Sequence, residues 1–259
     1  MKIDMHCHTK EGSIDAKVPI EKYIHRLVEH GFDGMLVTDH NSYNGYRKFQ
    51  EIASKVEREL KKPFVVLKGI EYDTRDGGHV IAILPDHVKT TALEIKGMTI
   101  AQLERFVHKL GGVIGPAHPF GPGFFAFMNT HFGKKNIDFL NKFDFVEAFN
   151  ACTKPLANMK AEVMAGILGK PKTAGSDAHK EHIIGKAFTE FNQDIRNNND
   201  LIRAIKEGRM VDAGGQVHDK VLEKKNQLVE KLGVMGYWIY NKSGAWWNSL
   251  RLRKIVKRL

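Results

Sequence analysis

Cysteine is scarce in this chain, because only Cys7 and Cys152 occur among its 259 residues. So few cysteines exclude a disulfide framework and fit a reducing compartment such as the cytosol. The chain also lacks any run of about 18 apolar residues, so no segment is expected to span a membrane. Its first residues, MKIDMH, are too short and too polar for a signal peptide, and we expect none.

Acidic residues are too few to balance the basic ones, and the excess is unevenly spread. The net charge is +10, from 40 Lys and Arg against 30 Asp and Glu. Residues 216–259 hold ten basic and three acidic residues, a net charge of +7, which leaves +3 for residues 1–215. We therefore divide the chain into a main domain over 1–215 and a basic, aromatic extension over 216–259.

The extension ends in a predicted amphipathic helix. Its apolar residues Leu252, Ile255, Val256 and Leu259 follow helical spacing, and three Trp and two Tyr precede them. Such a helix could dock on the main domain through its aromatic residues. It could also lie on an anionic membrane surface or contact the phosphates of a nucleic acid. The sequence leaves these three alternatives open.

Short apolar segments alternate with amphipathic ones along the main domain. Predicted strands cover residues 2–6, 34–38, 64–72, 79–84, 112–115, 143–150, 172–176 and 187–191. Predicted helices cover residues 20–30, 46–61, 99–110, 158–168 and 199–207. This alternation predicts an α/β domain with a parallel sheet, of the (β/α) barrel type. An open doubly wound sheet is the alternative, but the first turn, CHTKEGS, lacks the glycine-rich fingerprint of that fold.

Six of the thirteen histidines lie at strand ends or in the turns that bound strands. They are His6, His8, His40, His79, His118 and His179, and Glu71 and Asp177 occupy similar positions. In a barrel of this type the active site forms at the carboxyl ends of the strands. One histidine at a strand end is usually a hydrogen-bonded structural residue. Six of them beside two carboxylates predict a metal site, because buried imidazoles and carboxylates need partners.

The first strand separates polar from apolar residues. Because side chains alternate along a strand, Asp4, His6 and His8 of KIDMHCH are expected on one face, toward the barrel mouth. The apolar residues between them are expected to pack under the helices. Cys7 belongs to that apolar set, so we interpret it as a small core residue and not as a ligand.

These residues resemble the motifs of the PHP superfamily, named for polymerases and histidinol phosphatases. Four motifs occur in order: D-x-H-x-H-T from Asp4 to Thr9, T-D-H from Thr38 to His40, H-P at His118 and Pro119, and S-D-A-H from Ser176 to His179. Glu71 and His79 also match. The resemblance covers about residues 1–215. It implies a distorted (β/α)7 TIM-like barrel, to which residues 216–259 would add a C-terminal helical appendage.

The resemblance also implies up to three divalent metal ions at the barrel mouth. His6, His8, Glu71 and Asp177 would hold the first ion. Glu71 would bridge to a second ion, completed by His79 and His118. His40 and His179 would hold the third. Imidazole and carboxylate ligands without thiolate favour Zn, Mn or Fe over Ca or Mg.

The third site departs from the common pattern of the family. Members often carry an Asp five residues after the second histidine, a position that Ser13 occupies here. Asp15 and Glu11 lie two residues to either side. We predict Asp15 as the ligand and keep Glu11 as the alternative. If neither side chain reaches the ion, the third site is weak or empty.

Clustered divalent ions bridged by a carboxylate suit the hydrolysis of phosphate esters by an activated water. We therefore predict a phosphoesterase for a small phosphomonoester or nucleotide, with catalytic roles for His6, His8, Glu71, Asp177 and His179. Asp4 and Asp39 could orient ligand imidazoles, or they could cap turns. No C-x5-R loop of a cysteine phosphatase follows either cysteine.

Substrate contacts are less clear from the sequence. Arg75 and Lys154 are candidates to contact a second phosphate, although each could be a solvated loop charge. The stretch PFGPGFFAFMNTHFGKK carries five phenylalanines. It could form a lid or a stacking surface, or it could pack into a small core of its own. We interpret His131 within it as structural or substrate-facing.

The alternative function is a PHP-like metal-binding scaffold that residues 216–259 recruit to a membrane surface or a nucleic acid. An amidohydrolase is a third possibility, but the sequence offers no good candidate for the carbamylated lysine that those enzymes often use. We expect a cytoplasmic protein, or one peripheral at the membrane, with a small phosphorylated substrate. No obligate protein partner is evident.

Overall fold

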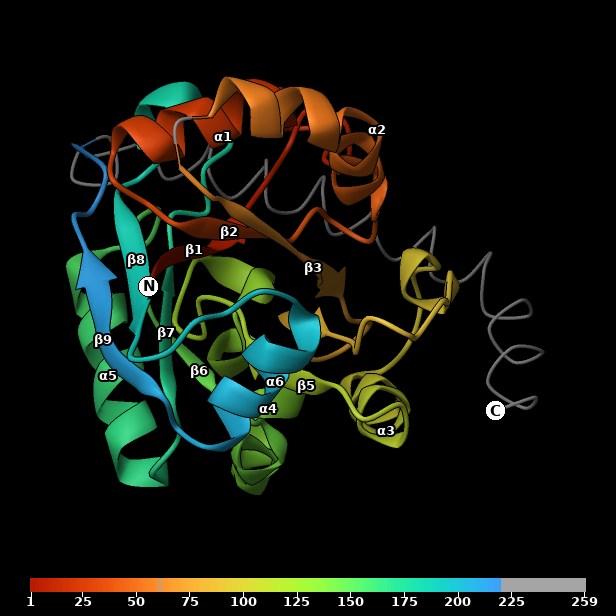
Figure 1. Cartoon of the computed structure of the whole chain (residues 1–259). Coiled ribbons are helices and arrows are strands. Elements are labelled where there is room, and N and C mark those ends of the chain that lie inside the picture. The colour runs from red at the N-terminus through yellow and green to blue at the C-terminus, as the bar shows by residue number, and fades with distance from the viewer. Residues whose placement is uncertain (61, 220–259) are drawn as a thin grey trace.

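The computed structural model describes residues 1–60 and 62–219, which Figure 1 shows in colour. The predicted amphipathic helix of the extension lies outside the described residues. Among the described helices, none has both the length and the apolar character that crossing a bilayer requires.

Within the described residues, seven strands form one curved sheet in the order β5-β4-β3-β2-β1-β8-β9, and two more form the pair β6-β7 (Figure 1). The strands are β1 (Lys2–Cys7), β2 (Gly34–Val37), β3 (Val65–Asp73), β4 (His79–Ile83), β5 (Val113–Pro116), β6 (Val146–Asn150), β7 (Lys172–Gly175), β8 (Ala187–Phe191) and β9 (Met210–Gly215). A parallel bridge between Cys7 and Ala178 joins the end of β7 to β1. The two sheets therefore meet at β1.

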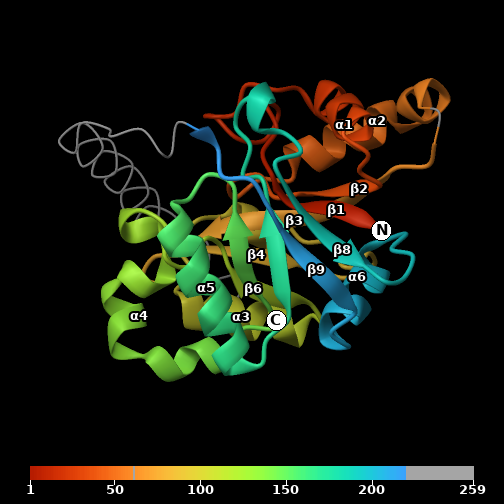
Figure 2. The same ribbon diagram turned by 90° about the vertical axis from the view of Figure 1, so that its left-hand side faces the viewer.

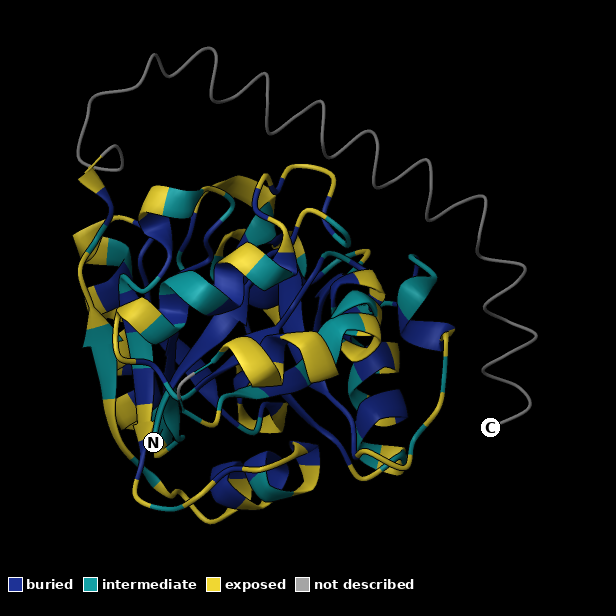
Figure 3. Cartoon of the chain, turned by 45° about the horizontal axis from the view of Figure 1, so that its top comes forward, coloured by how far each residue is buried: buried dark blue, intermediate teal, exposed yellow. Residues whose placement is uncertain are grey.

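Helices cover the sheets from several sides (Figures 1 and 2). They are α1 (Ile20–Glu29), α2 (Asn44–Glu59), α3 (Ile100–Lys109), α4 (His131–Lys135), α5 (Pro155–Leu168) and α6 (Asn198–Lys206). The helix α1 forms because Ile20, Tyr23, Ile24 and Leu27 recur at helical spacing and are all buried. Gly31, at φ 78°, follows its end in the left-handed conformation that favours glycine. The helices turn buried faces inward and exposed faces outward, as Figure 3 shows.

The α/β class predicted from the sequence is confirmed, but the sheet is mixed and not parallel throughout. The pairs β1/β2, β2/β3 and β6/β7 are parallel. The pairs β3/β4, β4/β5, β1/β8 and β8/β9 are antiparallel. The turn between Asp73 and His79 is too short for the crossover that a parallel pair needs. The closed (β/α)7 barrel stays a prediction.

The apolar residues of β1 do not all pack together, contrary to the expectation from strict alternation. Ile3 and Met5 join a core cluster that includes residues of α6, such as Leu201. Cys7 packs in another cluster, with Tyr23 and Leu27 of α1. The register of β1 against β2 shifts between Asp4 and Cys7, which breaks the alternation. Cys7 still lies under a helix, as predicted.

Candidate metal centre

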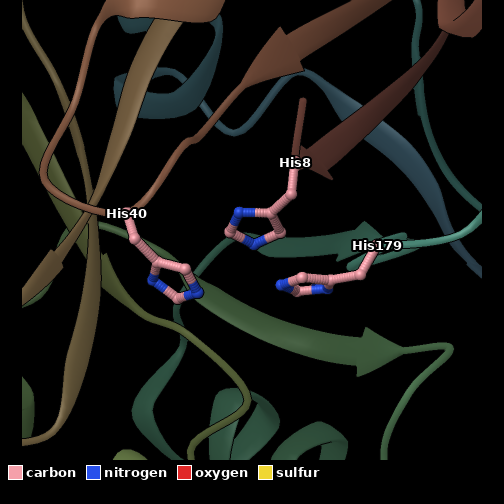
Figure 4. Close-up of side chains that lie close together, drawn as sticks. All are labelled: His8, His40 and His179. Atoms are coloured by element: carbon pink, nitrogen blue, oxygen red, sulfur yellow. The ribbon is translucent and has the colours of Figure 1, made fainter. Parts of the chain in front are cut away.

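The six predicted histidines converge on one cavity although they come from distant parts of the chain. Their rings are close: the centroid of His8 lies 4.2 Å from that of His179 and 4.5 Å from that of His40. Figure 4 shows these three rings turned toward one another from separate loops. The cavity has a volume of about 270 Å³, and its lining includes His40, His79, His118 and His179. The strand ends thus bring the histidines together, while their role as metal ligands stays a prediction.

Glu71, on β3, lies at the middle of this cluster. Its Oε1 lies 2.9 Å from His79 Nδ1 and 3.0 Å from His118 Nε2. Its Oε2 lies 3.1 Å from His40 Nδ1, 3.2 Å from His8 Nε2 and 3.4 Å from His6 Nε2. One buried carboxylate therefore faces five of the six imidazoles. This is the position that a carboxylate bridging two ions requires.

Asp177 completes the group expected for the first ion. Its Oδ1 lies 3.2 Å from His8 Nε2 and 3.6 Å from His6 Nε2. The two imidazoles face each other, with 3.0 Å between their Nε2 atoms. Ligand atoms of His6, His8 and Asp177 lie within 4.8 Å of one another, close enough to share one ion.

The structure brings Asp15, and not Glu11, to the third group. Asp15 Oδ2 lies 3.3 Å from His179 Nε2 and 3.9 Å from His40 Nε2. Burial opposes ionisation of Asp15, but its hydrogen bond with His179 and the nearby imidazoles hold its pKa below the ordinary value. Glu11 instead accepts a hydrogen bond from the backbone N–H of Ile20, where α1 begins. The geometry therefore favours Asp15 as the predicted ligand.

Ser13 occupies the place of the family aspartate and takes a supporting position. Its Oγ lies 3.1 Å from His8 Nδ1, donates to Asp39 Oδ1 at 2.9 Å and accepts from the backbone N–H of His40 at 3.1 Å. Asp39 also accepts from the backbone N–H and the hydroxyl of Thr9, at 2.7 and 2.8 Å. Ser13, itself bonded to Asp39, thus orients the imidazole of His8 and the backbone of His40.

Glu147, on β6, supports His6 and was missed in the sequence. Its Oε1 lies 2.8 Å from His6 Nδ1, and its Oε2 accepts from the backbone N–H of His118 and from Asn150 Nδ2. The available signal was the lone acidic residue in the apolar segment FVEAFN. A buried carboxylate that contacts the far nitrogen of a ligand imidazole fixes its tautomer and orientation.

Asp73 is a second carboxylate that sequence reasoning missed. It follows Glu71 by two residues on β3, and its Oδ1 lies 3.2 Å from His79 Nε2 and 3.4 Å from His40 Nδ1. Lys96 Nζ lies 3.1 Å from Asp73 Oδ2. Asp4, which the sequence placed among the candidate orienting residues, accepts from the backbone N–H of Ser176 at 2.9 Å.

Backbone strain gathers at this cavity. Among the described residues, the non-glycine residues with positive φ are Asn41, His118 and Asp177, at 48°, 30° and 51°. Each lies in a loop that carries part of the cluster, and such conformations persist where surrounding contacts enforce them. Gly175 permits the close approach of β7 to β1, because a Cβ there would lie 2.1 Å from His6 Cβ.

The charges of the cluster reinforce one another. Burial opposes protonation of His6, but facing carboxylates, Glu147 first among them, raise its pKa well above the ordinary value. Burial likewise opposes ionisation of Glu71, but the surrounding imidazoles hold its pKa well below the ordinary value. Opposite charges packed at this distance stabilise each other's charged forms.

The residues of the cluster fit divalent metal ions. Glu71 Oε2 is buried, and although imidazole nitrogens lie 3.1–3.4 Å away, none of them meets the geometry of a hydrogen bond to it. A buried oxygen in that state is ready to serve as a ligand. Cys7 contributes no sulfur, because it is buried in the core and burial raises the pKa of its thiol. Cys152 lines the first cavity, so a sulfur lies near the cluster, and a ligand set of nitrogen and oxygen only stays a prediction.

The predicted substrate residues fall in different places. Arg75 lines a second cavity beside the first, whereas Lys154 lines neither. The phenylalanine-rich stretch does not form a small core of its own, contrary to one of its interpretations. Phe127 is fully buried in the large core cluster that includes Tyr72 and Leu103, and Phe132 packs against that cluster. Phe124 and Phe125 instead line the second cavity, as does His131.

Known proteins share parts of this chain and its fold. A family model described as PHP-associated matches residues 155–210. A PolC-type DNA polymerase III of Lacticaseibacillus paracasei is 29% identical over 91 residues, which are 35% of this chain and 6% of the polymerase. The chain thus spans only a small part of that curated relative.

Two solved structures share the fold. PsfC from Pseudomonas syringae superposes with a TM-score of 0.59 at 18% identity, over 93% of this chain and 98% of that one. A Bifidobacterium adolescentis protein named as a metal-dependent phosphoesterase superposes with a TM-score of 0.54 at 15% identity, over 80% and 96% of the two chains. The family model thus matches the last part of the main domain, and the two structures share its fold. The four histidine motifs resemble those of the PHP superfamily, to which the matched model is related by its description.

Proposed function

We propose that this chain is a metal-dependent hydrolase that cleaves phosphate esters. The observation that carries the proposal is the position of Glu71, whose two oxygens face separate sets of imidazoles in one buried cavity. A carboxylate so placed suits two neighbouring cations, and paired cations suit the displacement of an alcohol from a phosphoryl group. The name of the Bifidobacterium relative is in accord with this activity.

The ligand set divides into three groups in this proposal. His6, His8, Asp177 and Glu71 would hold the first ion, and Glu71, His79 and His118 would hold the second. His40, His179 and Asp15 would hold the third. The bound ions would lower the pKa of a coordinated water and offset phosphoryl charge. Zn, Mn and Fe all suit these ligands.

Residues behind the ligands keep the imidazoles in place. Glu147 accepts from His6 Nδ1–H, which leaves Nε2 of that ring free to act as a ligand. Ser13 contacts the Nδ1 atom of His8 and so fixes its ring in the same way. Neither ring needs to rotate when an ion or a substrate binds, which lowers the cost of reaching the reactive geometry.

The test is metal analysis joined to a phosphate-release screen. The protein, purified with Mn or Zn, should carry bound metal by mass spectrometry and release phosphate from at least one ester in a panel of phosphomonoesters and nucleotides. His8→Ala and Asp177→Ala should each lower turnover on the order of 10³-fold, because each removes a ligand of the reacting ion. The exposed His87 provides a matched control, His87→Ala.

Unchanged turnover in both ligand variants would reject the proposal. A second panel, of amide substrates, tests the alternative that the protein is an amidohydrolase. Metal-dependent release of amine without release of phosphate would replace the proposed reaction by that one.

A further inference from the structure

The helix α5 carries apolar side chains on its outer side as well as on its buried side. Leu156, Met159, Val163 and Ile167 are between 55% and 80% exposed, and they recur every three or four residues. This spacing places the four side chains in one stripe along the helix, which lies on the outside of the fold (Figure 2). The opposite side of α5 is buried. Contiguous apolar surface of this kind marks an interaction site.

Exposed lysines flank the stripe. Lys154 directly precedes the helix and Lys160 lies within it, and both are exposed. Residues 154–172 have a net charge of +3, and the one acidic residue in that range, Glu162, forms an ion pair with Lys172. The surface around the stripe is therefore positive, and a positive surface favours an anionic partner.

Two neighbouring segments extend this positive surface. Residues 134–142 have a net charge of +2 and adjoin the end of α5, where Lys170 Nζ donates to the backbone carbonyl of Asn141. The extension, with its net charge of +7, joins the main domain near the start of α5, because the backbone N–H of His218 donates to the carbonyl of Ala151. The three segments together carry +12 and the whole chain carries +10, so the rest of the molecule is slightly negative.

We propose that α5 is a membrane-binding surface, whose apolar stripe enters the interface of an anionic bilayer while the surrounding lysines contact lipid phosphates. Stable attachment to a bilayer takes two features of this kind, because a single apolar anchor or a single basic patch gives only weak and reversible binding. The stripe and the basic surface around it supply both. Because the stripe runs along α5, the helix would lie parallel to the membrane plane.

A second copy of the chain is a less suitable partner for this surface. A stable interface between two proteins buries about 800 Å² on each of them, and four partly exposed side chains on one helix supply less. Contact between two copies would also bring two positive surfaces together, which is unfavourable. An anionic membrane matches both the apolar and the charged part of the surface.

Vesicle flotation with the full chain tests the proposal. Wild-type protein should float with vesicles of phosphatidylcholine and phosphatidylglycerol, but not with vesicles of phosphatidylcholine alone, which carry no net charge. Ile167→Glu should lower the partition coefficient for the anionic vesicles about tenfold, because it withdraws a large apolar side chain from the bilayer interface. Lys160→Ala should lower it about fivefold, the effect of one lysine near an anionic surface.

Matched controls exist for both variants. Ile14→Glu makes the same exchange at an isoleucine that is 85% exposed, against 80% for Ile167, and that lies in the loop between β1 and α1. Lys89→Ala removes an exposed lysine from the loop after β4. Both controls should keep the wild-type partition coefficient. Thermal melting of all four variants checks that each one folds.

The outcomes separate this surface from its alternatives. Equal binding of Ile167→Glu and wild type to anionic vesicles would overturn the proposal, and so would wild-type protein that floats with neither kind of vesicle. If sedimentation velocity then shows a wild-type dimer that Ile167→Glu dissociates, the stripe belongs to a second copy. Release of phosphate from a small soluble ester should be the same in wild type and Ile167→Glu, so the proposed phosphoesterase stands or falls independently.

Discussion

The strand β1 and the residue that follows it carry apolar and polar side chains that are equally buried. Ile3, Met5 and Cys7 are at most 1% exposed, and Asp4, His6 and His8 are fully buried between them. The apolar set is stabilised by loss of apolar surface to water. The polar set loses its contacts with water, and hydrogen bonds or ion pairs within the protein must offset that cost. The comparison shows that burial alone does not distinguish a core residue from a site residue. The distinction lies in whether the buried side chain contacts apolar groups or charged ones.

Partners within the protein offset the lost hydration of Asp4 and of His6 to different degrees. His6 faces three carboxylates, which raise its pKa well above the ordinary value against the effect of burial. Asp4 accepts hydrogen bonds from two backbone N–H groups, but burial is the stronger effect and raises its pKa to about 6. The charge of His6 is therefore compensated by the cluster, whereas the charge of Asp4 is only partly so.

Met5→Ala tests the apolar set and should give the largest loss of stability. Removing a fully buried methionine leaves a cavity and should lower the free energy of unfolding by about 2–5 kcal/mol. Urea unfolding measures the loss, and Met159→Ala on the exposed face of α5 is the matched control. Metal content per folded chain should stay at the wild-type value. A loss of metal equal to that of His8→Ala would show that the two sets are not separable.

Asp4→Asn tests the incompletely compensated charge. Because the pKa of Asp4 is raised from 3.8 to about 6 in the folded chain, the unfolded chain releases its proton first. Stability in metal-free buffer should therefore fall by up to about 3 kcal/mol as pH rises through this window, and then level off. The amide oxygen of Asn can still accept the two backbone hydrogen bonds but carries no charge.

The measurement is urea unfolding of wild type and variant from pH 4 to pH 7. The free energy of unfolding of Asp4→Asn should lack this fall, so the difference between the two proteins grows with pH. Asp138→Asn, at an exposed position, should follow the wild-type curve. Parallel curves for wild type and Asp4→Asn would contradict the assigned cause.

Glu147→Gln tests the contact between the Glu147 carboxylate and the Nδ1 atom of His6. The amide keeps the shape of the side chain but loses the charge that fixes His6, so metal affinity should fall about 10–100-fold. Competition with a chelator measures the affinity, and Glu190→Gln at an exposed position is the control. An affinity equal to that of wild type would remove Glu147 from the support of the site.

Cys7→Ala should give the smallest effect. The thiol packs in the core under α1, so its loss should cost about 1 kcal/mol of stability and leave the metal content unchanged. Mass spectrometry and urea unfolding measure both quantities, with Met159→Ala at an exposed position as the control. Loss of metal from Cys7→Ala would make the sulfur part of the ligand set after all.

The sequence was sufficient for the parts of the site that lie at strand ends. His6, His40 and His118 could be placed because the carboxyl ends of strands converge in a barrel-like fold. Glu147 could not, because one acidic residue in an apolar strand does not show which distant side chain it will contact. Asp73 was missed although a signal existed: it lies two residues after Glu71 on the same strand, and alternation places both side chains on one face.

The fold was predictable to a similar extent. Apolar periodicity located the strands and most helices, since their lengths and spacing are local properties. The antiparallel pairs depend on how strands meet in space, and only the short Gly77–Gly78 turn hinted at one of them. The strand β9 was not predicted because none of its residues is buried, so no apolar pattern marks it.

The position of Glu71 has a consequence for how the cluster would respond to substitution. Five imidazoles face this one carboxylate, so the loss of its charge would disturb five of the six predicted ligands at once. A substitution of Asp15, by contrast, would directly affect only His40 and His179. Damage to the cluster should therefore be general when it begins at Glu71 and local when it begins at the rim.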